Sequence, residues 1–315
     1  MTAISSITSN RYVQLMRIDH WIKQLFILPG AACGIFFINT DVLSLTTRVL
    51  IALLATSIIA SANYVINEYL DAPTDKFHPK KKYRTAVMSS IDARVVWVLW
   101  GVLSVAGLAT GLLVNVPFTV TLASLWIMGI LYNVKPLRTK DITYLDVISE
   151  SVNNAIRLML GWFVVIQTML PPSSIIIGYW MAGAFLMATK RLAEYRMIGD
   201  ARQASLYRKS FAGYTEQTLL CSAVFYAMTS VFLIGVFLIK YRIELIAFIP
   251  FLILLYCYYL FLAYRDDSCV QKPEKLFREP GLMIYCTFLL ILFCVLLFID
   301  IPQLAVFTSN LLISI

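Results

Sequence analysis

Three polar residues recur at four-residue intervals where the second long apolar run of the chain ends: Asn67, Asp71 and Asp75. On a helix this spacing places one amide and two carboxylates on a common face, with a drift of about 40° per step. Mg²⁺ usually takes one or two carboxylates from a protein and completes its shell with substrate phosphates. We therefore predict a magnesium site here, with Pro73 ending the helix before Asp75 and weakening the reach of that carboxylate.

Cations follow this motif directly, in the segment from Lys76 to Arg84. Lys and Arg side chains hold phosphate groups by charge-assisted hydrogen bonds. Together the two segments predict a site for a metal-bound diphosphate at a membrane surface. The same residues also fit a solvated loop beyond a membrane helix, where positive charge collects on the cytoplasmic side, and the spacing alone leaves both interpretations open.

The composition places these residues in a membrane protein. The chain has 315 residues, of which 60% are hydrophobic and 14% are charged, and its mean hydropathy is +0.78. Runs of about twenty apolar residues recur throughout, as in transmembrane helices. We predict an all-α integral membrane protein with a bundle of about nine transmembrane helices, forming a single polytopic domain over residues 1–315. The predicted spans are 22–40, 46–66, 94–114, 117–133, 143–163, 174–191, 217–239, 245–264 and 281–299.

Positive charge is concentrated in alternate connections between these spans. The N-terminal segment carries it, and so do residues 71–94, 135–140, 190–209 and 265–278. The positive-inside rule then predicts a cytoplasmic N-terminus, a C-terminus on the outside and one cytoplasmic face at which all the charged connections meet. The net charge of +8 therefore reflects membrane orientation and does not indicate nucleic-acid binding. The six cysteines show no CxxC spacing, so neither a disulfide framework nor a zinc site is predicted.

One predicted span carries ionisable groups that are costly in a lipid environment. A polar stripe on the span 143–163 is formed at helical spacing by Asp146, Glu150, Asn153, Asn154 and Arg157. A functional role explains such a stripe, with Arg157 as its clearest binding candidate. An intramembrane ion pair that only holds helices together is the alternative.

A second polar segment follows the sixth predicted span. Lys190 and Glu194 are one helical turn apart and face the same way. The ammonium group can hold a phosphate and the carboxylate can accept hydrogen bonds from a sugar hydroxyl, although an ion pair on a solvated face fits the same spacing. Arg208 and Lys209, further along the chain, are predicted to meet lipid headgroups.

Two other segments supply candidate phosphate contacts. Lys23 follows the interface residue Trp21 and is predicted to point inward. Lys135, Arg138 and Lys140 lie between the fourth and fifth predicted spans. These three fit a phosphate site and also fit cations that only reach the membrane surface.

Together these segments resemble the UbiA intramembrane prenyltransferase superfamily. The resemblance covers nearly the whole chain and rests on Asn67-xxx-Asp71-xxx-Asp75 after the second span and on the polar segment after the sixth. Ordinary members carry a second Asp-rich motif in that later segment, where this chain has Lys190-Arg191-xx-Glu194. This departure is similar to the decaprenyl-phosphate phosphoribosyltransferase branch. The other segments that carry the similarity are Arg17-xxx-Trp21-Ile22-Lys23, His78-Pro79-xx-Lys82-Tyr83-Arg84 and Arg208-Lys209-Ser210-xxx-Tyr214.

The resemblance implies a UbiA-like helical bundle with a central cavity that faces the cytoplasm. It also implies a multi-pass enzyme of the bacterial inner membrane whose active site lies in that cavity. Its reaction would move the 5-phosphoribosyl group of phosphoribosyl diphosphate (PRPP) to a polyprenyl, decaprenyl-type phosphate and release diphosphate, for envelope polysaccharide precursors. Mg²⁺ would be the cofactor, and PRPP, polyprenyl phosphate and membrane lipids the partners. No nucleic acid is expected, and the oligomeric state stays open between a monomer and a homo-oligomer.

The same resemblance implies roles for individual residues. The metal ligands would be Asn67 and Asp71, assisted by Asp75. The catalytic set would be Asp71, Asn67, Lys190 and Glu194, with Glu194 at the ribose hydroxyls. Substrate contacts would come from Lys23, Tyr64, Lys81, Lys82 and Arg84 at the diphosphate, Lys190 and Arg191 at the 5-phosphate, and Lys140 and Arg157 at the polyprenyl phosphate.

Two other functions remain open from the sequence. A conventional UbiA prenyltransferase would use a prenyl diphosphate and an aromatic acceptor. That function keeps the first motif but leaves the cationic second segment unexplained. A transporter would carry intramembrane charge on both sides of a site near the membrane midplane, whereas the charge in this chain is confined to one side.

Overall fold

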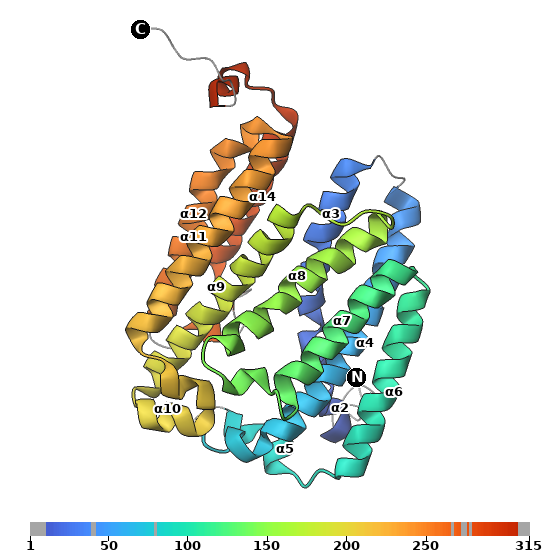
Figure 1. Cartoon of the computed structure of the whole chain (residues 1–315), viewed down its shortest axis with the longest axis vertical. Coiled ribbons are helices and arrows are strands. Elements are labelled where there is room, and N and C mark those ends of the chain that lie inside the picture. The colour runs from blue at the N-terminus through green and yellow to red at the C-terminus, as the bar shows by residue number, and fades with distance from the viewer. Residues whose placement is uncertain are drawn as a thin grey trace. The chain divides into compact units, whose positions relative to one another are not determined.

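The computed structural model describes residues 11–38, 42–78, 81–265, 268–271, 276 and 279–307. Within these ranges every regular element is a helix (Figure 1). The chain divides into two compact units, Met1–Pro171 with Ile198–Thr215 and Pro172–Met197 with Glu216–Ile315. The all-α fold class predicted from the composition is confirmed.

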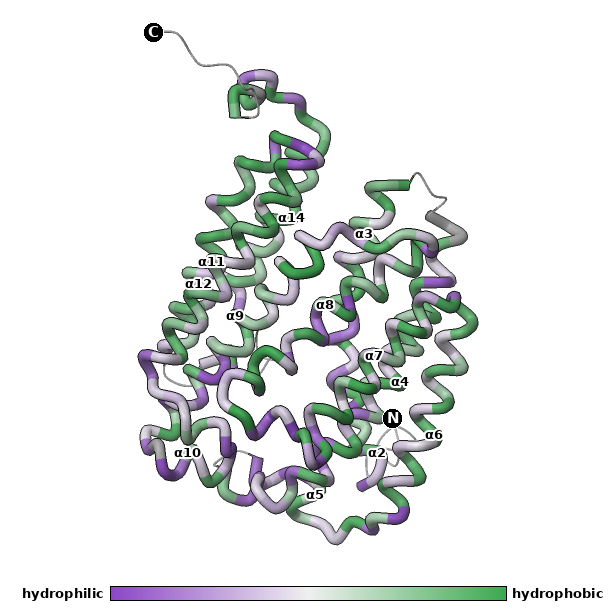
Figure 2. Tube along the Cα trace, in the orientation of Figure 1, coloured by the Kyte–Doolittle hydropathy of each residue, from purple (hydrophilic) through white to green (hydrophobic). Residues whose placement is uncertain are grey.

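The first unit contains the helices that follow the N-terminus and one short returning segment. Hydrophobic residues cover most of the length of its long helices, and hydrophilic residues gather around α5 and α10 (Figure 2). Its elements are α2 (Arg11–Leu15), η1 (Ile18–Ile27), α3 (Leu28–Phe37), α4 (Val42–Asp75), η2 (Lys81–Tyr83), α5 (Thr85–Met88), α6 (Ala93–Leu112), α7 (Val116–Asn133), η3 (Thr139–Asp141), α8 (Leu145–Val165), α10 (Ala201–Tyr207) and η4 (Lys209–Gly213).

The second unit is organised around a shared buried hydroxyl. Ser230 on α11 donates to the carbonyl of Gly178 on α9 at 2.8 Å and also contacts the hydroxyl of Tyr256 on α12 at 2.8 Å. Three helices are thereby joined through one side chain. The elements of this unit are α9 (Ser173–Ile198), α11 (Glu216–Tyr241), η5 (Ile243–Phe248), α12 (Ile249–Ala263), η6 (Cys269–Gln271), α14 (Pro280–Phe298) and η7 (Pro302–Phe307).

Seven stretches of the described chain are long and apolar enough to cross a membrane by length and composition. They are Arg11–Phe37, Leu45–Asp75, Ala93–Leu112, Val116–Asn133, Glu216–Tyr241, Ile243–Ala263 and Pro280–Phe298. Helices α8 and α9 coincide with the predicted spans 143–163 and 174–191, but they carry more polar residues and are not among the seven. The multi-pass architecture is supported, while the predicted count of nine spans is not confirmed.

Side-chain caps fix where two of the long helices begin. The Asp92 carboxylate accepts from the backbone N–H of Arg94 at 2.8 Å at the start of α6. The Asn115 side chain accepts from the N–H of Phe118 at 2.8 Å and donates to the carbonyl of Phe163 on α8 at 2.7 Å. Asn115 therefore caps α7 and ties it to α8 with one amide, because a cap satisfies backbone donors that the first turn leaves open.

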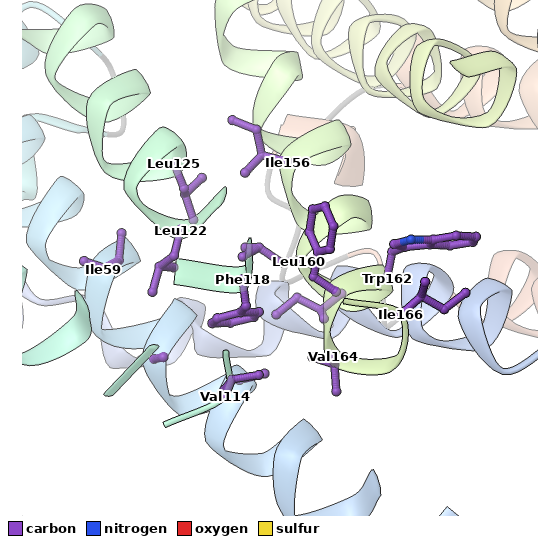
Figure 3. Close-up of a cluster of buried hydrophobic side chains, with 14 of the residues drawn as sticks. Ile59, Val114, Phe118, Leu122, Leu125, Ile156, Leu160, Trp162, Val164 and Ile166 are labelled. Atoms are coloured by element: carbon purple, nitrogen blue, oxygen red, sulfur yellow. The ribbon is translucent and has the colours of Figure 1, made fainter. Parts of the chain in front are cut away.

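A buried apolar cluster packs α4, α7 and α8 against one another in the first unit (Figure 3). Phe118 and Leu122 of α7 lie beside Ile59 of α4, and Leu160 of α8 completes the layer. All four side chains are fully buried. This cluster lies away from the polar ends of the same helices, so it supplies a rigid base on which those ends are held.

Two glycines allow α3 and α8 to approach at backbone distance. A Cβ atom at Gly30 would collide with the carbonyl oxygen of Leu158, and one at Gly161 would collide with the carbonyl oxygen of Ile27. Such close backbone contact needs residues without a side chain, as at the small-residue interfaces of membrane helices.

We expect Gly161→Ala to destabilise the protein by about 3 kcal/mol, because the added methyl group meets backbone that has no rotamer to change. The measurement is thermal unfolding of the detergent-purified protein. Gly101→Ala is the matched control, since nothing lies within 4 Å of a Cβ at that helical position. Equal unfolding temperatures for the two variants would contradict the close contact.

Candidate active site

Helix α4 continues past Pro73 and ends at Asp75. The prediction that Pro73 ends the helix before Asp75 is therefore wrong. Pro73 has no N–H to donate to the carbonyl of Tyr69, yet the helix continues for two more residues to Asp75. As the four-residue spacing predicts, Asn67 and Asp71 lie side by side on this helix, and the Asn67 amide nitrogen is 3.3 Å from Asp71 Oδ2.

A cavity of about 490 Å³ opens beside the end of α4. Its walls come from α4, from the segment between α7 and α8, and from the residues that follow α10. Its charged lining consists of Asp71, Asp75, Lys135, Arg138, Lys140, Asp141, Arg208 and Lys209. Five cations against three carboxylates make this a cavity for an anionic ligand.

Two cations converge on the Asp71 carboxylate. Arg138 lies 2.9 Å and Lys140 lies 2.5 Å from Asp71 Oδ1. Arg138 also pairs with Asp141 at 3.1 Å and donates to the carbonyl of Asn133. Lys140 is 4% exposed, and burial lowers its pKa to about 8 although the Asp71 carboxylate opposes that shift.

Asn133, the last residue of α7, orders these groups and was missed in the sequence. Its amide nitrogen donates to the carbonyl of Gly129 at 2.8 Å, so its oxygen faces the cavity residues. That oxygen accepts from Lys140 at 2.7 Å and from Asn67 at 2.5 Å. Because the Asn67 nitrogen is committed to Asn133, its oxygen is the atom left to serve as a ligand. The sequence signal that could have identified Asn133 is its position at the polar end of an apolar span.

The donor set at this site fits a hard divalent cation that relies on its substrate. Among the described residues, no three His, Cys, Asp or Glu side chains gather as a metal site. Asn67 and Asp71 supply one amide oxygen and one carboxylate within a single helical turn. Mg²⁺ commonly takes so few protein ligands and completes its octahedron with phosphate oxygens.

Asp75 is placed differently from its two motif partners. It is 2% exposed, and its Oδ2 atom lies 2.6 Å from a terminal nitrogen of Arg84. This ion pair joins the end of α4 to the cationic segment that follows it. To act as a ligand, Asp75 would have to exchange Arg84 for the metal or use its other oxygen.

The remaining predicted contacts of the cationic segment surround Tyr207. The Lys81 ammonium lies 4.3 Å from the centre of the Tyr207 ring, and the His78 ring packs on the same tyrosine at 4.3 Å. Lys82 is exposed and lies over its neighbour Tyr83. This segment therefore holds the end of α10 beside the cavity.

Arg208 lines the cavity, so its predicted place at lipid headgroups is wrong. It lies 3.4 Å from Asp146 and 3.3 Å from the hydroxyl of Tyr132, both on neighbouring helices. Asp146 is fully buried at the start of α8 and also accepts from Ser210 at 3.1 Å and Tyr214 at 2.7 Å. The Asp146 carboxylate thus holds the segment after α10 against α8 through three donors. The sequence does not reveal this contact, because Asp146 and Arg208 are 62 residues apart.

We expect Asp146→Ala to lower the stability of the protein by about 3 kcal/mol, because it removes a buried acceptor from the half-buried Arg208 guanidinium and from two hydroxyl groups. Thermal unfolding in detergent measures the change. Asp92→Ala is the control: it removes an exposed cap and should cost about 1 kcal/mol. A smaller loss for the buried site than for the cap would contradict the role given to Asp146.

The polar stripe on α8 meets η1. Arg157 Nε donates to the side-chain oxygen of Gln24 at 3.0 Å. Lys23 on the same η1 helix contacts His20 at 2.8 Å, and the His20 ring packs on Tyr64 of α4 at 5.4 Å. Predicted contacts Lys23, Tyr64 and Arg157 therefore lie on three adjacent elements of the first unit.

The predicted residues of the later polar segment belong to the second unit. Lys190, Arg191 and Glu194 lie on α9. Arg191 is 1% exposed and lies 3.4 Å from Glu194, which is also buried. The i, i+3 pair holds two buried charges of opposite sign, and Lys190 is half-buried one residue earlier.

Comparison with known protein families places most of the chain in one family. The model of the UbiA prenyltransferase family matches residues 27–283. The chain belongs to the UbiA prenyltransferase family. Its match includes the Asn67–Asp75 motif, the cavity residues on η3 and the polar segment of α9.

Several named relatives and solved structures of the UbiA family are similar to this chain. The chain is 27% identical over 210 residues to the decaprenyl-phosphate phosphoribosyltransferase of Mycolicibacterium smegmatis, covering 66% of this chain and 63% of that protein. It is 26% identical over 180 residues to the protoheme IX farnesyltransferase of Geobacillus kaustophilus, covering 54% and 56%. A UbiA homologue from Archaeoglobus fulgidus bound to GPP and Mg²⁺ has the same fold, with a TM-score of 0.67, 22% identity and coverage of 91% of this chain and 99% of that one.

Proposed function

We propose that this UbiA-family protein transfers the 5-phosphoribosyl group of PRPP to a polyprenyl phosphate and releases diphosphate. The observation that carries the proposal is the cavity at Asp71, whose lining has more cations than carboxylates. PRPP brings a diphosphate and a 5-phosphate, and the acceptor brings another phosphate. A site that binds this much negative charge needs many cations and few carboxylates. The mycobacterial relatives named decaprenyl-phosphate phosphoribosyltransferase support the same substrate pair.

In this proposal Asn67 and Asp71 hold Mg²⁺, with Asp75 assisting. The ion would neutralise the diphosphate when it is bound. Lys140 bonds to Asp71 and Arg138 pairs with the same carboxylate, so we assign both cations to the diphosphate. This assignment moves Lys140 away from the acceptor phosphate. Arg208 extends this positive wall.

The reaction needs orientation and charge neutralisation more than proton transfer. An acceptor phosphate oxygen, already anionic at neutral pH, forms a bond to C1 of the ribose. The C1–oxygen bond to diphosphate breaks, and its electron pair leaves on the diphosphate. Cations fixed before the reaction stabilise the charge that develops on that group. Attack from the opposite face inverts C1.

Other assignments remain part of the proposal. Lys190 and Arg191 would bind the 5-phosphate, with Glu194 at the ribose hydroxyls, and Lys23, Tyr64, Lys81, Lys82 and Arg84 would add diphosphate contacts. Arg157 would hold the acceptor phosphate. We also propose that the protein lies in a bacterial inner membrane with the cavity facing the cytoplasm, since the positive connections share that side.

The test is product identification by mass spectrometry. Purified protein receives Mg²⁺, PRPP labelled in its ribose, and farnesyl phosphate as a short polyprenyl phosphate. We expect the label in a lipid product heavier than the acceptor by one phosphoribosyl group, with one diphosphate released per transfer. Unchanged PRPP, together with consumption of farnesyl diphosphate and an aromatic acceptor, would instead support a conventional UbiA prenyltransferase, as the name of the Geobacillus relative suggests.

A further inference from the structure

Two buried amides beside Arg157 have polar atoms that lack partners. Gln24 is fully buried on η1, and its amide nitrogen has no hydrogen-bond partner among the described residues. The side-chain oxygen of Asn153 on α8 is buried and lacks a partner within the same described part of the chain. A buried polar group without a partner costs about 1–3 kcal/mol, so each such group needs an explanation.

The hydrogen bonds of Arg157 fix which atoms these are. A guanidinium group only donates, so the Gln24 oxygen faces Arg157 Nε at 3.0 Å and the Gln24 nitrogen points elsewhere. Arg157 Nη1 donates to the backbone carbonyl of Asn153 at 3.3 Å. Arg157 therefore contacts two residues that each have an unpartnered side-chain atom. On Gln24 this atom is the amide nitrogen, a donor, and on Asn153 it is the amide oxygen, an acceptor.

A ligand that complements all three groups would accept a hydrogen bond from Gln24, donate one to Asn153 and carry negative charge for Arg157. A monoprotonated phosphate monoester has this combination, with anionic oxygens and one P–OH group. Its second pKa is about 6 in water, and a hydrogen bond from the P–OH group to the Asn153 oxygen favours the monoprotonated form.

We propose that Gln24, Asn153 and Arg157 form the subsite that binds the phosphate of the polyprenyl acceptor and selects a phosphate monoester over the free alcohol. This inference rests on the proposed function for the identity of the lipid. The Arg157 charge selects the phosphate monoester over the alcohol, because a hydroxyl group can bond to both amides but carries no charge for the guanidinium. The Gln24 and Asn153 amides position the phosphate beside Arg157.

Direct binding separates this subsite from catalysis. Radiolabelled farnesyl phosphate is bound to the detergent-purified protein, and unlabelled farnesol, inorganic phosphate and PRPP are tested as competitors. We expect Gln24→Met and Asn153→Ala each to weaken farnesyl phosphate binding at least about tenfold, because each removes a hydrogen bond to a charged group. PRPP binding to the same variants should change less than twofold. Farnesol and inorganic phosphate should compete weakly with the wild-type protein.

Thr56→Ala is the matched control, since it removes a buried hydroxyl that bonds within its own helix to the carbonyl of Ala52. Farnesyl phosphate binding by both amide variants at the Thr56→Ala level would overturn the subsite, and so would equal binding of farnesol. If the wild-type protein binds farnesyl phosphate through Gln24 and Asn153 but neither binds nor consumes PRPP, the subsite stands and the proposed function fails.

Discussion

Asp71→Asn is expected to reduce phosphoribosyl transfer by on the order of 10³-fold while leaving the protein folded. Asparagine keeps the size of the side chain but removes the charge that a divalent cation needs. Folding should survive because Arg138 retains Asp141 and the carbonyl of Asn133, and Lys140 retains the Asn133 side chain. Initial rates with saturating PRPP and Mg²⁺, together with thermal unfolding, measure both effects.

Asp75→Asn is the informative companion to this variant. If Asp75 holds Arg84 in place without binding the metal, its replacement lowers stability through the 2.6 Å ion pair and reduces turnover far less than Asp71→Asn does. If it ligates the metal directly, the two losses of turnover are similar. Full activity of Asp71→Asn in folded protein would remove Asp71 from the metal site.

The fold was predictable because its signals are local. Apolar runs and the alternation of charged connections need only neighbouring residues, and the predicted span 117–133 coincides with α7 (Val116–Asn133) almost residue for residue. The end of α4 was harder to predict, because proline usually ends or kinks a helix, whereas α4 continues past Pro73 to Asp75. Helical spacing also placed Asn67 beside Asp71 correctly.

The cavity was only partly predictable because its walls come from distant parts of the sequence. Arg138 lies 67 residues from the carboxylate that it binds. Arg208 looked like a headgroup contact, and only folding reveals that a fully buried Asp146 holds it at the cavity. Asn133 carries no charge and matches no spacing rule, yet it orients both Lys140 and Asn67. Polar residues at the ends of apolar spans should therefore be treated as site candidates even when they are neutral.

Lys140→Met is expected to lower kcat for phosphoribosyl transfer by about 10- to 100-fold, with a smaller change in KM for PRPP. The Lys140 ammonium is buried and fixed by Asp71 and Asn133, so it is already placed when charge develops on the departing diphosphate. A charge-assisted hydrogen bond of this kind contributes about 1.5–3 kcal/mol. An interaction that strengthens in the transition state affects kcat more than substrate binding.

Two other variants separate charge from position in the role of Lys140. Lys140→Arg keeps the charge on a longer, planar group and should recover only part of the rate. Lys76→Met removes an exposed cation that lies over Phe77 at 4.9 Å, and we expect wild-type rates from it. If Lys140→Met raises KM for PRPP and leaves kcat unchanged, Lys140 binds the ground state and the transition state equally. Leaving-group stabilisation would then have to come from Arg138, which lies 2.9 Å from the same Asp71 oxygen.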